Sequence, residues 1–216
     1  MMKRAIYLIV LIPFLLIGCA NNQDEQQVTT EVNSISTNET PSYYQGYLDN
    51  PQVTNDQSLQ EVGTTIRDVK GEVTLNDINK ESQTVKIGAI ELTIREAKAL
   101  HFKPDYGLID FFHSYTHDQE FDFVKVFVEI KNTSNQNLKF APISLVHTSA
   151  GEQKTWEDDI YLEELNGEIP ANETKKGNLG FIIEKSKIDS FEITTSDVFN
   201  EQDKTLDDAE KLKIKF

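Results

Sequence analysis

The chain has 216 residues, of which 36 are acidic and 21 are basic, so its net charge at pH 7 is −15. This acidic excess argues against a nucleic-acid partner, because phosphate binding depends on Lys and Arg. Cys19 is the only cysteine, which excludes an intrachain disulfide and leaves the fold to depend on its apolar core.

The N-terminus is typical of a secretory leader. Two basic residues precede an apolar run from Ala5 to Ile17, which is shorter than the roughly 20 residues that a membrane span needs. Leu16-Ile17-Gly18-Cys19 resembles the lipobox of bacterial lipoproteins. The resemblance implies that residues 1–18 are a signal peptide that is removed. It also implies that Cys19 carries a lipid with palmitate-type chains, which holds the protein on the extracellular face of the cell membrane.

The next segment, residues 19–70, is predicted to be the lipidated cysteine followed by a flexible, disordered polar tether. It is rich in Asn, Gln, Thr, Ser and Glu and shows no sustained helical or alternating pattern. Tyr43, Tyr44 and Tyr47 interrupt this composition. They either dock weakly on the following domain or bind a partner.

From residue 71 to residue 216 short alternating segments predict a globular domain. The residues 72–75 and 84–87 are short candidate strands, and residues 89–95 alternate cleanly. Phe121 to Lys131 is the strongest candidate, with Val124, Val126, Val128 and Ile130 on one face. We expect it to be a central strand.

The remaining segments continue the same pattern. A strand from Leu138 to His147 is interrupted at Pro142, and further strands are expected at residues 174–184, 190–194 and 212–216. A short helix at residues 157–165 is the one helical candidate. Seven or more short strands without long helices predict an all-β fold, namely an antiparallel sandwich.

Several of these segments together carry a family resemblance. They are Gly88 to Ile94, Phe123 to Ser134, Ile169 to Thr174 and Gly180 to Glu184. The series resembles the telokin-like, immunoglobulin-like domain of Gram-positive bacterial lipoproteins. The resemblance implies an exported immunoglobulin-like antiparallel β-sandwich and supplies no catalytic residues.

A metal site is the one constellation with ligand chemistry. His113 and His117 are four residues apart, with Asp118 next to them, and on a helix the two imidazoles would face one ion. The segment lies between two predicted strands and lacks the glutamate of a zinc hydrolase helix. A solvated loop is the competing interpretation.

Two acidic clusters and the only tryptophan have structural explanations. Neither Glu157 to Glu164 nor Asp203 to Glu210 has the spacing of a calcium loop, so we expect solvated faces. Trp156, together with Tyr161, either packs over the end of the sandwich, which we favour, or forms an exposed recognition patch. There is no nucleophile elbow and no glycine-rich phosphate loop.

The sequence therefore predicts a protein without catalytic activity or cofactor. Its partners would be the membrane, through the lipid on Cys19, and a cell-surface or envelope protein bound by the domain. A lipoprotein that binds a small ligand or a metal ion is the alternative, and an extracellular hydrolase is a third hypothesis.

Overall fold

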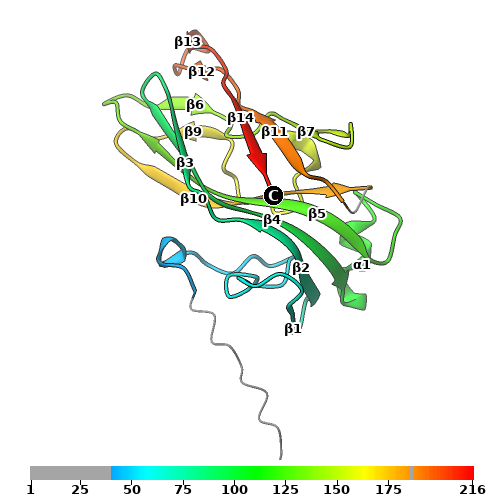
Figure 1. Ribbon diagram of the computed structural model, residues 1–216. Coiled ribbons are helices and arrows are strands. Elements are labelled where there is room, and N and C mark those ends of the chain that lie inside the picture. The colour runs from blue at the N-terminus through cyan, green and yellow to red at the C-terminus, as the bar shows by residue number, and fades with distance from the viewer. Residues whose placement is uncertain (1–39, 185–186) are drawn as a thin grey trace, which may run out of the picture. The chain divides into compact units, whose positions relative to one another are not determined.

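A computed structural model describes residues 40–184 and 187–216, which belong to one compact unit (Figure 1). The described chain is all-β, with antiparallel strand pairing throughout. Only short helical turns interrupt the strands: η1 (Ser42–Tyr44), η2 (Tyr106–Leu108), α1 (Ile109–Phe112) and η3 (Trp156–Asp158). Within the described residues, no helix has the length and apolar character to cross a bilayer.

The largest sheet has six strands in the order β1-β2-β4-β5-β10, with β3 also paired to β4. Its strands are β1 (Thr65–Asp68), β2 (Gly71–Asn79), β3 (Gln83–Ile87), β4 (Ile90–Pro104), β5 (Phe121–Asn132) and β10 (Thr174–Ile183). The prediction that Phe121 to Lys131 is a central strand is confirmed, because β5 lies between β4 and β10.

Two four-stranded sheets complete the fold. One has the order β14-β11-β7-β8, and the other has the order β13-β12-β6-β9. Their strands are β6 (Leu138–Phe140), β7 (Leu145–Thr148), β8 (Gln153–Thr155), β9 (Gly167–Ile169), β11 (Ser190–Thr194), β12 (Val198–Phe199), β13 (Thr205–Asp207) and β14 (Lys211–Lys215).

The apolar core lies mainly between the large sheet and the two small ones. Leu92, Val126 and Val128 from the large sheet share one buried cluster with Phe140 and Ile193 from the small sheets. A second cluster on the other part of the large sheet contains aromatic residues of β4 and β5 together with Val53 and Leu59. The second cluster therefore includes side chains from the segment N-terminal to β1.

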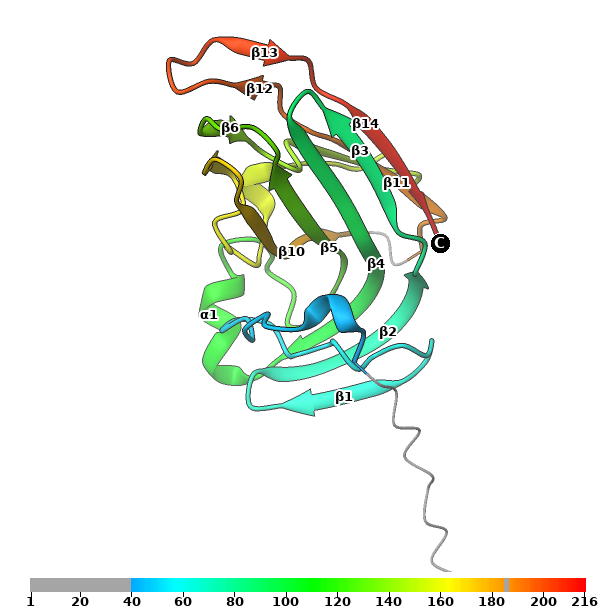
Figure 2. The same cartoon turned by 90° about the vertical axis from the view of Figure 1, so that its left-hand side faces the viewer.

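That segment corrects the predicted domain boundary. Residues 40–70 were expected to belong to a flexible tether, yet they pack along the large sheet (Figure 2). Tyr44, Val53 and Leu59 are at most 2% exposed, and residues 65–68 form β1. Polar composition concealed them, because several of the buried residues, Asn50, Thr54 and Asp56, are themselves polar.

Two further local predictions are wrong. The expected helix at residues 157–165 is limited to the single turn η3. Trp156 does not pack over the end of the sheets, since it is 53% exposed. The predicted interruption at Pro142 is confirmed and is larger than expected, because β6 and β7 on either side of it belong to different sheets.

Candidate functional site

The N-terminal segment covers the face of β5 that points away from the main core. Tyr43, Tyr44 and Tyr47 surround Phe127, with ring centroids 5.7, 4.4 and 5.4 Å from its ring. Tyr44 and Phe127 are at most 2% exposed. Of the two interpretations of the tyrosines, docking on the domain is the one that the structure shows, and the contact is extensive where weak docking was expected.

A β-bulge in β4 brings charged side chains to the same face. The pairing of β4 with β5 shifts between Ile94 and Glu96, so one residue, Arg95, is inserted. Even-numbered residues of β4 therefore change faces at the bulge. Ile94, before it, faces the main core, whereas Leu100 and Phe102, after it, belong to the second cluster on the opposite face. The shift thus turns Glu96 and Lys98 toward the N-terminal segment.

Four ionisable side chains meet there and form what we call the ion cluster: Asp56, Glu96, Lys98 and Lys125. All four are at most 5% exposed at the side chain. Lys98 and Lys125 are directly opposite each other on β4 and β5, an arrangement of like charges that needs compensation. Asp56 and Glu96 supply two negative charges against two positive ones.

The contacts within the ion cluster are short. Asp56 Oδ2 lies 2.6 Å from Lys125 Nζ and 2.9 Å from Lys98 Nζ. Glu96 Oε1 lies 2.9 Å from Lys98 Nζ and 3.6 Å from Lys125 Nζ. Tyr43 and Tyr44 donate hydrogen bonds to Glu96, and Lys125 donates one to Tyr44 at 2.9 Å.

The four groups differ in how the protein shifts their pKa values. Burial alone would raise the pKa of Asp56, but the charges of Lys125 and Lys98 outweigh it and hold that pKa at about 2. Burial lowers the pKa of Lys125. Burial also acts to lower the pKa of Lys98, but Asp56 and Glu96 outweigh it, so this pKa is raised. The two lysines are therefore not equivalent.

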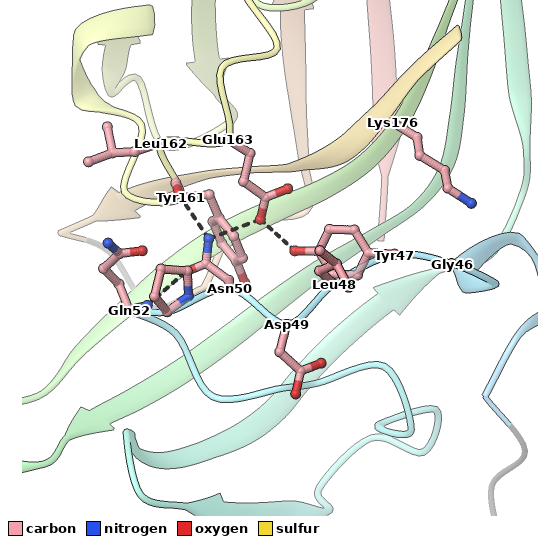
Figure 3. A pocket seen from close by; sticks show the side chains of 11 residues that line it. Gly46, Tyr47, Leu48, Asp49, Asn50, Gln52, Tyr161, Leu162, Glu163 and Lys176 are labelled. Carbon is pink, nitrogen blue, oxygen red and sulfur yellow. Dashed lines mark hydrogen bonds between the residues drawn. The ribbon is translucent and has the colours of Figure 1, made fainter.

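Beside the ion cluster lies an open depression of about 420 Å³, which we call the N-terminal cleft (Figure 3). Residues 46–52, residues 161–163 and Lys176 line it. Glu163 holds its two walls together, because it accepts hydrogen bonds from Tyr47 and Asn50 (Figure 3). Burial raises the pKa of Glu163.

Asp159 shapes the loop on one side of this cleft. Its Oδ1 accepts hydrogen bonds from the backbone N–H of Tyr161 and Gly180, and its Oδ2 accepts one from Leu162. Burial raises the pKa of Asp159 to about 6 in spite of these three donors. Leu162 adopts a left-handed backbone with a φ of 53°, which costs a non-glycine residue on the order of 1–2 kcal/mol.

The cleft presents apolar side chains to solvent. Leu48 is 84% exposed and Leu162 is 53% exposed, and both line the cleft. Solvent-facing leucines at a hollow are typical of a contact surface, whereas a lone exposed leucine needs no explanation.

The residues predicted to bind metal lie elsewhere. His113 and His117 are exposed in the turn after α1, with ring centroids 6.4 Å apart, and Asp118 is exposed as well. In the part of the chain that the structure describes, no group of three or more His, Cys, Asp or Glu side chains is arranged to hold a metal ion. The predicted metal site gains no support, and Cys19 lies outside the described residues.

Sequence reasoning missed the ion cluster and misjudged the acidic segment. Asp159 is 7% exposed and Glu163 is hydrogen-bonded to the N-terminal segment, so neither belongs to the expected solvated face. A signal for the cluster was present in β5. Phe123, Lys125 and Phe127 follow one another on the face opposite the valines, which indicates that something covers that face too.

Residues 60–205 match the family described as Domain of unknown function (DUF4352). The chain belongs to this family. The Uncharacterized protein YdhF of Bacillus subtilis (strain 168) is 44% identical over 235 residues, an alignment that covers 99% of this chain and all of YdhF. The family found here does not carry the telokin-like name, so that resemblance stays a prediction.

A solved structure supports the fold. A functionally unknown protein from Listeria monocytogenes EGD-e is similar with a TM-score of 0.51 at 14% identity, covering 68% of this chain and 87% of that protein. The ycdA protein of Bacillus subtilis overlaps with a TM-score of 0.31 at 20% identity, over 72% of this chain and 39% of that protein. The first likeness concerns the fold alone, and the second is too weak to support an argument.

Proposed function

We propose that the protein is an extracellular lipoprotein, anchored by a lipid on Cys19, whose immunoglobulin-like β-sandwich binds a protein of the cell envelope without catalysing a reaction. The observation that carries the binding role is the N-terminal cleft, where Leu48 and Leu162 face solvent beside acidic residues. The anchor rests on the lipobox resemblance of residues 16–19.

The chemistry of the cleft favours a particular kind of partner segment. Leu48, Pro51 and Leu162 offer apolar contacts, while the exposed carboxylate of Asp49 lies along the same hollow. The one lysine that lines it, Lys176, donates its hydrogen bonds to the backbone oxygens of Tyr43 and Gln45. A peptide with an apolar side chain next to a Lys or Arg would complement this surface.

The binding role is tested by photo-cross-linking on intact cells. A photoreactive amino acid is placed at position 48, at position 162 or, as a control, at Leu206, which is 45% exposed on β13. We expect one protein adduct of the same mass from positions 48 and 162 and none from position 206. The adduct should disappear when Leu162→Asp is combined with the probe at position 48. Equal labelling at all three positions would contradict the proposal.

The anchor is tested separately, so the two parts of the proposal can fail independently. Cys19→Ala should abolish incorporation of labelled palmitate and release the protein from the membrane fraction. Labelling that persists in this variant would exclude Cys19 as the lipid attachment point.

The cleft volume also favours a second candidate, the binding of a small ligand. About 420 Å³ lies within the range of roughly 300–1,000 Å³ that small-molecule sites occupy. A compound that raises the melting temperature of the wild-type protein, but not that of Leu162→Asp, would support this alternative.

A further inference from the structure

The ion cluster contains the parts of an amide-forming reaction. An amine, Lys125 Nζ, lies 2.6 Å from a carboxylate oxygen of Asp56, and both side chains are removed from solvent. The two residues are 69 positions apart and come from different elements, β5 and the N-terminal segment. We propose that Lys125 and Asp56 become joined by a side-chain amide bond, formed by the folded protein itself with release of one water molecule.

The atoms and charges balance without any further reactant. One proton first passes from the Lys125 ammonium group to the Asp56 carboxylate, which it contacts at 2.6 Å, so that a neutral amine faces a neutral carboxyl group. Lys125 Nζ then attacks Asp56 Cγ, so a C–N bond forms and one C–O bond of the carboxyl group breaks. The two protons that the ammonium group loses leave with that oxygen as water. A cation and an anion become a neutral amide, and the net charge of the cluster does not change.

The neighbours of the pair suit three separate roles. Lys98 contacts Asp56 Oδ2 at 2.9 Å and keeps its proton, so it can stabilise negative charge on that oxygen during attack. Burial favours the neutral, nucleophilic form of Lys125. Glu96 contacts both lysines, and its Oε1 lies 3.6 Å from Lys125 Nζ, so it can accept the proton that Nζ loses after the attack. The surroundings raise the pKa of Lys98 and lower the pKa of Lys125, and a difference of this kind lets one group act as an acid and the other as a nucleophile.

A receiving site for the water lies beside Asp56. A cavity of about 10 Å³, close to the space that a single water needs, is lined by Asp56, Tyr161 and Asn178. The hydroxyl of Tyr161 and the amide oxygen of Asn178 are buried and have no hydrogen-bond partner within the described structure. These two orphaned groups are independent of the ion cluster and would both be satisfied by a water molecule.

Dry surroundings make the bond durable once formed. Tyr44 and Phe127 cover the cluster at 2% and 0% exposure, which limits the access of bulk water to the amide. The bond would fix the N-terminal segment to β5. In the lipid-anchored protein, tension from the membrane would then pass into β5 without loading residues 57–124.

Peptide mass mapping of the full chain tests the proposal. A glutamate-specific protease cuts after Glu39, Glu61, Glu120 and Glu129, so residues 40–61 hold Asp56 and residues 121–129 hold Lys125. We expect these two peptides to appear as one species that is lighter than their sum by one water. The same deficit should appear in the intact mass of the denatured chain.

Variants identify the reacting groups. Lys125→Arg and Glu96→Gln should both restore the full mass. Lys70→Arg serves as the matched control, since this lysine contacts Asp68 and the backbone of Asn50 outside the ion cluster, and it should leave the mass deficit unchanged. Two separate peptides at their full masses in the wild-type protein would overturn the proposal. Joining of residues 40–61 to residues 97–120 would instead assign the reaction to Lys98.

Discussion

At the scale of single residues, Asp159 makes stability depend on pH. Its pKa of about 6 exceeds that of an unfolded aspartate, near 4, so the folded state holds the proton more tightly. The stabilisation that Asp159 gives the folded state is therefore complete below about pH 4 and is lost as the pH rises through about 6. The free energy of unfolding should fall by about 3 kcal/mol over that interval, because one pKa unit corresponds to about 1.4 kcal/mol.

Asp159→Asn should remove most of this decrease, since an amide does not ionise. Urea unfolding at a series of pH values measures it, with Glu157→Gln as the control because Glu157 is exposed on the same loop. Part of the decrease should survive in Asp159→Asn, since burial also raises the pKa of Glu163. Parallel stability curves for the wild type and Asp159→Asn would show that Asp159 is not the group responsible.

The same residue marks the limit of prediction from sequence at this scale. Asp159 stands in an acidic run with Glu157, which is exposed, and Asp158, which is half-buried, and nothing in the run marks Asp159 as the buried carboxylate. Burial is decided by the backbone N–H groups of Gly180 and Leu162, which the fold brings to it. Alternation along β5, in contrast, made Val126 and Val128 predictable core residues because strand geometry alone fixes their face.

At the scale of elements, the terminal strand β14 closes a small sheet and should be necessary for stability. It pairs with β11 from Ser190 to Thr194, and its Leu212 and Ile214 are 8% and 1% exposed. Deleting residues 212–216 removes both side chains from the main core. Since each large-to-small change in a core typically costs about 2–5 kcal/mol, we expect a large decrease in melting temperature.

Leu206→Ala is a suitable control for that deletion, because Leu206 is 45% exposed on β13 and should change the melting temperature little. An unchanged melting temperature after the deletion would refute the role of β14. This strand was predictable because Leu212, Ile214 and Phe216 alternate at the end of the chain. The bulge in β4 was not, since the alternation of residues 90–94 gives no sign that the phase changes at Arg95.

At the scale of the whole molecule, the N-terminal segment decides where the folding unit begins. Sequence composition placed the boundary at residue 71, whereas the packed structure extends to residue 40 among the described residues. A chain of residues 71–216 would lack Asp56 and all three tyrosines around Phe127. Lys98 and Lys125 would then share Glu96 as their single carboxylate partner in the ion cluster.

We therefore expect residues 40–216 to unfold cooperatively and residues 71–216 to be severely destabilised. Removing one partner of a buried ion pair typically costs about 3–5 kcal/mol, and the loss of Tyr44, Val53 and Leu59 from the packed sheet adds to it.

Circular dichroism melting compares the two chains directly. Residues 71–216 carrying Lys125→Met separate the two causes, because this change leaves Lys98 paired with Glu96 at 2.9 Å and removes the uncompensated positive charge, while the tyrosine contacts remain absent. Recovery of a cooperative transition in this variant would assign the defect to the charges, whereas continued failure would assign it to the lost apolar cover. If the unmodified chain of residues 71–216 melts like residues 40–216, the N-terminal segment is not part of the folding unit.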